Sequence, residues 1–143
     1  EGLSQEFPSP LLLEAAEKGA LIAMCDLGNQ YLKHNQRDEG EKWFKKALDL
    51  GYGDAAIPYY RLLLERGNTR EAVNALFSGA KAGSLQALKR LAWIFSRGRY
   101  KQMQDFAYTD CLLDVANKIL PEAPPEPIPD LDKLCPPPRI MGY

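Results

Sequence analysis

Few residues in this chain have the types and spacings that catalysis or metal binding requires. The chain has three cysteines, Cys25, Cys111 and Cys135, and a single histidine, His34. No two cysteines stand at C-x-x-C spacing, so a zinc site would have to gather its ligands from distant segments. His34 falls at the end of a predicted helix, with no acidic residue at triad-like spacing. We therefore expect no metal site, and we expect His34 to lie in solvent or to cap the helix.

Two carboxylates near the C-terminus are the other candidates for chemistry. Asp130 and Asp132 lie two residues apart in a segment rich in proline, which favours turns and surface positions over a fixed catalytic pair. The sequence also lacks a nucleophile elbow and a glycine-rich phosphate loop. These patterns predict a protein that is not an enzyme and that binds no cofactor. Cys111 and Cys135 could pair if the C-terminal segment folds back in an oxidising compartment, and otherwise they are free thiols.

Charge is segregated along the chain, although the net charge is only −1. No acid occurs between Glu71 and Asp105, where the sequence holds six bases: Lys81, Lys89, Arg90, Arg97, Arg99 and Lys101. From Asp105 to Cys135 there are seven acids and two lysines. Either the acidic segment neutralises the basic one within the molecule, or the basic face meets an acidic partner. The pI of about 5.9 and the lack of a long aromatic-and-basic strip argue against nucleic acid as the partner.

Positions that recur every 32 residues indicate which elements carry these side chains. Gly19, Gly51 and Gly83 are 32 residues apart, and each is followed four residues later by an alanine. Large apolar residues stand eight and twelve residues after each glycine: Leu27, Tyr59 and Leu91, then Tyr31, Leu63 and Phe95. Such self-similarity is typical of repeat proteins, in which one unit buries its apolar face only by stacking on its neighbours.

The apolar spacing within each unit predicts helices. We expect them at residues 11–18, 21–34, 38–50, 54–66, 71–82, 84–97 and 105–119. Ser9 and Ser84 are expected as N-caps, and Asn68 with Glu71 has the spacing of a capping box. Gly28 should let two helices approach closely. Aromatic, small and apolar residues of the helix over 38–50, the second of the first unit, should face inward: Gly40, Trp43, Phe44, Ala47 and Leu48.

The expected fold class is all-α, a short right-handed α-solenoid of antiparallel helix pairs. Residues 1–120 form the repeat domain, with a capping helix over 10–19 and units over about 20–51, 52–83 and 84–120. Residues 121–143 hold eight of the eleven prolines and should form an extended or irregular tail. We expect this tail to pack on the last helices through apolar residues: Leu131, Leu134 and Ile140.

A stripe on the first helix of each unit is the predicted partner-binding site. The stripe follows the inward residues by one or two positions and keeps i, i+4 spacing, so it should line a concave face. Its members are Asn29, Lys33, Arg61, Glu65, Lys89, Trp93 and Arg97. Four bases and one acid predict a partner protein with an acidic surface. Trp93 is either an anchor of this interface or a residue that the acidic tail covers.

Three stretches resemble the Sel-one-like repeat, a family of the tetratricopeptide type: Ala15-Ala16-Glu17-Lys18-Gly19, then Ala23, Leu27-Gly28 and Tyr31, then Trp43-Phe44-Lys45-Lys46-Ala47. The likeness covers about residues 11 to 119 and is strongest in the first unit. The second unit has Tyr59-Tyr60 where the family has Leu-Gly. The usual glycine-rich insertion between the helices is missing, which makes the period shorter than that of the family.

The C-terminal stretch adds a second resemblance. Residues 129–138 are similar to the proline-rich end of certain bacterial proteins with these repeats. Some proteins of this class are immunity proteins, which bind and silence antibacterial effectors of type VI secretion, including phospholipases. The resemblance implies a protein-binding immunity module, and a structural adaptor of an envelope complex is the alternative function. Cysteine-rich relatives that bind cell-wall-type ligands carry a cysteine pair in every unit, which this chain lacks, so a hydrolase is not expected.

Location follows from the same resemblance. Immunity proteins against effectors that act at the envelope lie in the periplasm, and a first residue, Glu1, other than methionine fits the removal of a targeting segment. A cytoplasmic location is the alternative. No apolar run in the sequence approaches the ~20 residues that a transmembrane helix needs.

Overall fold

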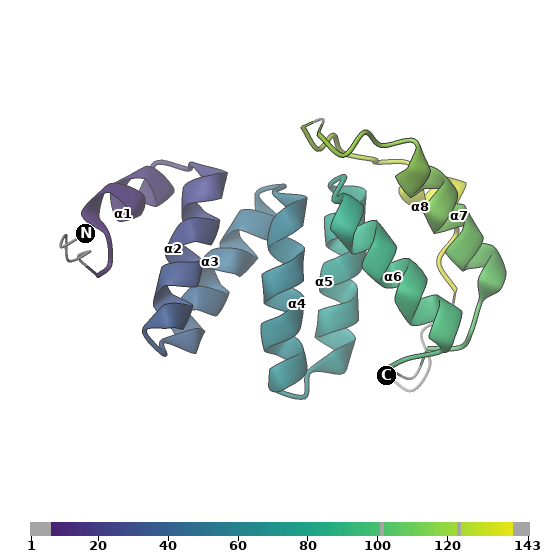
Figure 1. Ribbon diagram of the computed structural model, residues 1–143, viewed down its shortest axis with the longest axis horizontal. Coiled ribbons are helices and arrows are strands. Elements are labelled where there is room, and N and C mark those ends of the chain that lie inside the picture. Colours follow the sequence, from purple (N-terminus) through teal and green to yellow (C-terminus); the bar gives the residue numbers. More distant parts are fainter. Residues whose placement is uncertain (1–6, 101, 123, 139–143) are drawn as a thin grey trace.

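The computed structural model describes residues 7–100, 102–122 and 124–138. Within these ranges the chain forms eight α-helices and one 3-10 helix, and it forms no strand (Figure 1). The elements are α1 (Pro10–Glu17), α2 (Leu21–Lys33), α3 (Arg37–Asp49), η1 (Gly53–Ala55), α4 (Ala56–Glu65), α5 (Thr69–Lys81), α6 (Leu85–Arg97), α7 (Phe106–Asn117) and α8 (Leu131–Leu134). The predicted all-α fold is confirmed. The short α8 lies in the tail, where we expected no helix.

The helices pack mainly against their neighbours in the sequence. Figure 1 shows α1 to α7 side by side in a row, and each consecutive pair from α1–α2 to α6–α7 is in contact. The alternate helices α4 and α6 also touch each other. The core therefore runs along the row as a continuous layer of small and apolar side chains.

The central elements start at a regular interval of 16 residues, namely at Leu21, Arg37, Gly53, Thr69 and Leu85. The short η1 runs directly into α4, so the two count here as one element. A three-residue turn with one pattern of hydrogen bonds separates each of these elements from the next. At Gly51, for example, its own N–H donates to the Leu48 carbonyl at 2.9 Å, and the N–H of Tyr52 donates to the Ala47 carbonyl at 2.9 Å. This is the Schellman motif, which requires a positive φ at its central residue.

Glycine supplies that conformation at three of these turns, with φ of 102° at Gly51, 83° at Gly67 and 96° at Gly83, and also at Gly19 before α2, with φ of 98°. The turn after α2 uses Asn35 instead, with φ of 60°. Asparagine adopts this region more readily than most side chains, so the same turn forms without glycine. The 32-residue period of the sequence is thus two copies of one 16-residue unit of helix and turn.

Side-chain caps form at two of the predicted positions. Ser9 Oγ accepts a hydrogen bond from the Leu12 N–H at 3.4 Å, and Ser84 Oγ accepts one from the Ala87 N–H at 3.2 Å. The predicted capping box at Asn68 is wrong, because the Asn68 side chain makes no cap hydrogen bond. Asn68 closes a Schellman turn with ψ of 67°, which is outside the extended backbone region that a capping side chain needs.

Glycine allows α2 and α3 to approach closely. A Cβ atom at Gly28 would lie 2.8 Å from a ring carbon of Phe44, and one at Gly40 would lie 2.9 Å from the Gly28 carbonyl oxygen. Phe44 is fully buried at this contact, as the sequence predicts. The prediction that Trp43 is a core residue is wrong, because it is only partly buried and Lys46 lies over its ring. Consecutive helical residues point about 100° apart, so only one of the two rings can enter the interface.

The tail lies against α5 and α7. The N–H of Ile128 donates to the Lys81 carbonyl at 2.7 Å, and Lys81 Nζ lies 2.8 Å from Asp132 Oδ2. Leu131 is buried, whereas Leu134 is 59% exposed and so does not dock as expected. Residue Ile140, the third predicted contact, lies outside the described residues.

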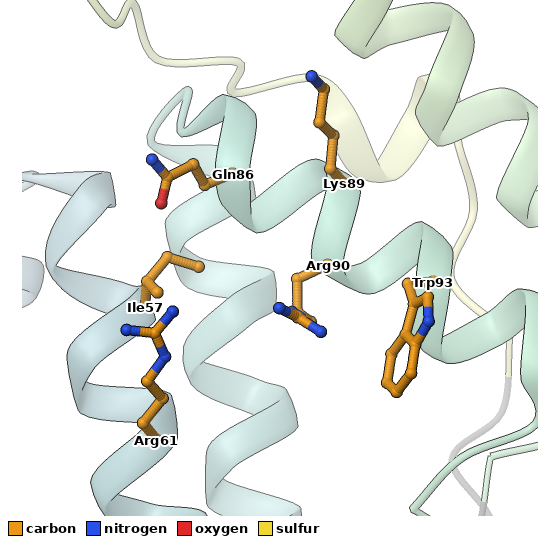
Figure 2. Close-up of a pocket in the computed structure, with 6 residues that line it drawn as sticks. All are labelled: Ile57, Arg61, Gln86, Lys89, Arg90 and Trp93. Carbon is orange, nitrogen blue, oxygen red and sulfur yellow. The ribbon is translucent and has the colours of Figure 1, made fainter.

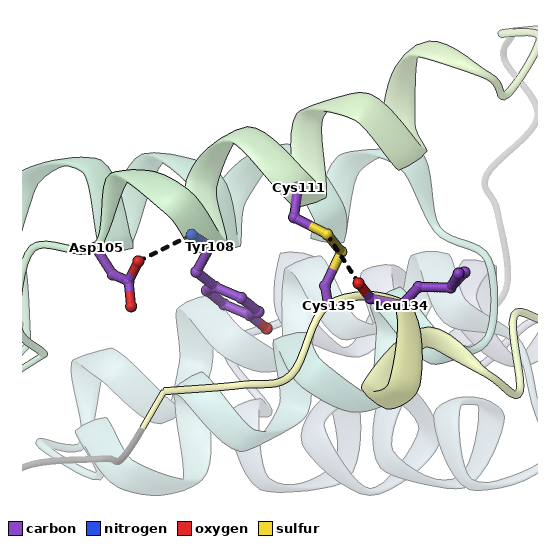
Figure 3. Close-up of a disulfide and its surroundings, with 5 residues drawn as sticks. All are labelled: Asp105, Tyr108, Cys111, Leu134 and Cys135. Atoms are coloured by element: carbon purple, nitrogen blue, oxygen red, sulfur yellow. Dashed lines mark hydrogen bonds between the residues drawn. A yellow bond between two sulfur atoms is a disulfide. The ribbon is translucent and has the colours of Figure 1, made fainter.

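A disulfide joins Cys111 on α7 to Cys135, with their Cα atoms 5.8 Å apart (Figure 3). The Leu134 carbonyl oxygen lies 3.2 Å from Cys111 Sγ, a close contact in which the bonded sulfur has no hydrogen to donate. On the same helix, Asp105 caps the first turn by accepting a hydrogen bond from the Tyr108 N–H at 2.9 Å. The two ends of the segment that follows α7 are therefore fixed, one by the helix and one by the disulfide.

Candidate functional site

A hollow between α4 and α6 gathers aromatic, apolar and basic side chains (Figure 2). Ile57 and Arg61 project from α4, one turn apart. The other lining residues come from α6 at helical spacing: Gln86, Lys89, Arg90 and Trp93. The hollow has a volume of about 350 Å³. It lies where these two alternate helices contact each other.

Trp93 has arginine side chains around its ring. The guanidinium carbons of Arg90, Arg97 and Arg99 lie 5.2, 5.4 and 5.4 Å from the ring centroid. Such cation–π contacts orient the guanidinium groups over the ring face. We call Trp93, these three arginines and the two other bases that line the hollow, Arg61 and Lys89, the Trp93 cluster.

The end of α6 explains why Arg99 reaches Trp93. Gly98 adopts a left-handed conformation with φ of 64°, and the Arg99 N–H donates back to the Ile94 carbonyl at 3.1 Å. The chain therefore turns back instead of leaving along the helix axis. Tyr100, the next residue, has its hydroxyl 3.4 Å from that of the buried Tyr60 of α4. Burial raises the pKa of Tyr60.

The cations of the Trp93 cluster have no internal counter-charge among the described residues. None of its five bases lies within 4.0 Å of a carboxylate of these residues. Other side chains of the described residues form seven ion-pair contacts. Among the described residues, the expected neutralisation by the acidic segment is limited to the pair of Lys81 and Asp132. The described part of the tail does not line the hollow of Trp93. The cluster is therefore a positively charged, partly aromatic surface.

The structure brings part of the predicted stripe together. Arg61, Lys89 and Trp93 line one hollow, and Arg97 covers the Trp93 ring. The remaining three residues of the stripe lie elsewhere: Asn29, Lys33 and Glu65.

Asn29 and Lys33 line a different hollow, of about 340 Å³, formed with Leu12 of α1. Glu65 ends α4 and forms an ion pair with Arg37 at the start of α3. The stripe is therefore divided between three surroundings, because the neighbouring helices differ at each unit even where the register is the same.

Sequence reasoning missed several members of the site. Gln86 and Arg90 precede Trp93 by seven and three residues on α6, which is the spacing of one helix face. Ile57 precedes Arg61 by one turn on α4 and was open to the same inference. Arg99 carries no such signal, since it reaches the ring only because the chain reverses at Gly98.

The remaining thiol has no environment for nucleophilic chemistry. Burial, followed by the nearby charges of Asp26 and Asp54, raises the pKa of Cys25 to about 12. The thiolate is the reactive form of cysteine, so this thiol stays protonated at neutral pH. The described residues contain no group of three His, Cys, Asp or Glu side chains placed to hold a metal ion.

Comparison with protein families, with curated proteins and with solved structures found no match to this chain. Across the described residues, no helix combines the length and the apolar character that a membrane span requires.

Proposed function

We propose that this protein is a helical-repeat binding module that captures an acidic surface of another protein through the Trp93 cluster. The observation that carries the proposal is that the five bases of the Trp93 cluster, three of them at the tryptophan ring, have no carboxylate partner in the described residues. Tryptophan and arginine dominate the energetics of protein interfaces, since both offer large contact areas with directional polar groups. Arginine also binds carboxylates through two parallel hydrogen bonds.

The partner belongs to the class that the sequence resemblance implies, a secreted antibacterial effector that this protein neutralises. The helix pairs, the 32-residue period and the Trp43–Ala47 stretch support a right-handed solenoid of the Sel-one-like kind. The Cys111–Cys135 disulfide supports an oxidising compartment such as the periplasm, because disulfides are rare in reducing cytoplasm.

Calorimetric titration tests the interface directly. The protein encoded beside this gene is titrated with the parent protein and with Trp93→Ala, Arg61→Ala and Asn29→Ala. Asn29 has the same register on α2 as Arg61 on α4, but it lies outside the Trp93 cluster, so it is the matched control. We expect Trp93→Ala to weaken binding by about 2 kcal/mol or more and Asn29→Ala to have no effect. Added salt should weaken binding of the parent.

Co-expression tests the neutralisation itself. Cells that produce the neighbouring effector should grow with the parent protein and should stop growing with folded Trp93→Ala. Equal affinity of the parent, Trp93→Ala and Arg61→Ala would exclude the Trp93 cluster as the interface. Normal binding without any effect on growth would instead assign the protein to an adaptor role.

A further inference from the structure

A second hollow adjoins the first along α6. Its volume is about 370 Å³, and it extends from the N-terminal end of α6 to the loop that follows α7. The lining residues include Leu85, Ile119, Leu120, Pro121 and Pro125. Gln86 and Lys89 line both hollows. The two hollows therefore adjoin on the surface of α6, and we call them together the α6 groove.

The two ends of the α6 groove have different chemistry. The end at Trp93 is basic and aromatic, whereas most side chains that line the other end are Leu, Ile or Pro, including Leu120, which is 65% exposed. Asp54 is the carboxylate at the apolar end, and it accepts a hydrogen bond from Ser84 Oγ at 2.8 Å. A ligand that fills the whole groove thus needs a negative charge at one end and an apolar group at the other.

The side-chain amide of Gln86 stands between the two ends and makes no hydrogen bond to another described residue. Its amide can donate and accept at once, which matches the N–H and C=O groups of a peptide backbone in extended conformation. Trp93 is eight residues from Leu85, or about 12 Å along α6 at 1.5 Å per residue. An extended peptide covers that distance with about four residues.

From this geometry we infer that the partner contributes an extended peptide segment, laid along α6, to the α6 groove. The segment places an Asp or Glu side chain at Arg61, Arg90 and Trp93. About four positions away it places an apolar side chain against Leu120 and the prolines of the second hollow. The inference rests on the proposed function and specifies its partner, since it makes the recognised element a short linear segment and not a folded surface.

A display library of random 12-residue peptides is the probe. The library is selected on the parent protein, after removal of peptides that bind the double variant Gln86→Ala, Trp93→Ala. We expect enrichment of peptides with an acidic residue about four positions from Leu, Ile, Phe or Pro. Gln86 and Leu120 are exposed, so their substitution should leave the fold intact, which circular dichroism checks.

The enriched peptide is then measured by fluorescence anisotropy with four variants. Leu120→Ser should weaken binding about tenfold, which corresponds to the loss of one buried leucine contact. Gln86→Ala should weaken it by about fivefold, as for the loss of a backbone hydrogen bond. Trp93→Ala should weaken it by about thirtyfold, and Asn29→Ala should not change it.

Three results would overturn the inference. The first is a selection that enriches no peptide. The second is an enriched peptide whose affinity does not depend on Gln86 or Leu120. The third is self-association of the parent protein that depends on Trp93, which would make a second copy of the chain the occupant of the groove. The calorimetric titration separates this failure from that of the proposed function. If the affinity of the neighbouring effector falls in Trp93→Ala but not in Leu120→Ser, the proposed function is supported and the inference of a peptide segment is wrong.

Discussion

Two regions of this molecule contain clustered arginines. In one region the arginines pair with carboxylates, and in the other they lie at an aromatic ring. At the contact between α3 and α4, Arg37 pairs with Glu65, and Arg66 pairs with Asp38 and with Glu41, the last at 2.7 Å. We call these five residues the α3–α4 seam. In the Trp93 cluster, three arginines lie at an aromatic ring, and none of the bases pairs with a carboxylate of the described residues.

The difference arises over a single helical turn. Arg61 and Glu65 are four residues apart on α4, yet one lines the hollow of Trp93 and the other belongs to the seam. The arginines of the seam pair with carboxylates of the same chain, so they are less available to bind a carboxylate of a partner protein. The cluster keeps a positive potential that only solvent or another molecule can neutralise. Composition alone does not separate these roles, because the position of the nearest carboxylate decides between them.

The comparison between the seam and the Trp93 cluster assumes that the core is equally well packed beneath both. Substitution of one buried phenylalanine in each region tests this. Phe44 on α3 and Phe95 on α6 are both fully buried. Phe44→Ala and Phe95→Ala should each lower the free energy of unfolding by about 3–5 kcal/mol, because each leaves a cavity. Urea denaturation followed by circular dichroism measures the loss. Trp43→Ala is the control and should cost less, since Trp43 is only partly buried.

A loss at Phe95 much smaller than at Phe44 would break the comparison. It would mean that the helices under the Trp93 cluster are loosely packed, and that the cluster is exposed for that reason.

The disulfide should give the next largest effect. It links residues that are 24 apart, so Cys135→Ser should lower the free energy of unfolding by about 3 kcal/mol through the greater freedom of the unfolded chain. The double variant Cys111→Ser, Cys135→Ser should lose no more than the single one, because both remove the same bond. Unchanged stability in Cys135→Ser would show that the tail beside the cluster is held by its other contacts.

Much of the fold could be predicted from the sequence, because the helices depend on local signals. The glycines at 19, 51 and 83 end helices as their spacing indicates, and Ser9 and Ser84 begin them. Asn35 hid the 16-residue interval, since it takes a glycine-like conformation that composition does not reveal. The burial of Phe44 in place of Trp43 depends on which ring faces α2, and periodicity resolves this only to within one residue.

The candidate site was less predictable, because it depends on contacts between helices. The register of Asn29, Arg61 and Trp93 is identical, but only two of them share a hollow. Glu65 was placed in the stripe by spacing and is removed from it by Arg37, which is 28 residues away in the chain. Such pairings follow from how α3 sits beside α4, which a single sequence does not specify.

The α3–α4 seam should contribute little to stability. The side chains of Arg37 and Glu65 are 63% and 49% exposed, and ion pairs with such exposure contribute below about 1 kcal/mol. A double-mutant cycle with Arg37→Ala and Glu65→Ala should therefore give a coupling energy below that value. A coupling energy well above it would make the seam a structural element and would sharpen its contrast with the cluster.

The smallest effect is expected from single bases of the Trp93 cluster. Arg97→Gln removes one cation–π contact but also relieves repulsion between neighbouring bases, so the stability should change by less than about 0.5 kcal/mol. Lys33→Gln is the matched control, because Lys33 has the same register on α2. A loss in Arg97→Gln well above that of the control would show that the cluster holds α6 together.

The identical turns between α2 and α6 also bear on how such a chain can evolve. Because each helix and its turn occupy the same number of residues, a gene segment that encodes one helix pair has interchangeable ends. In-frame duplication or loss of that segment would rejoin the chain at an equivalent turn and would keep every later helix in phase. The length of the protein can then vary by whole helix pairs through recombination, while the side chains facing a partner change by point mutation.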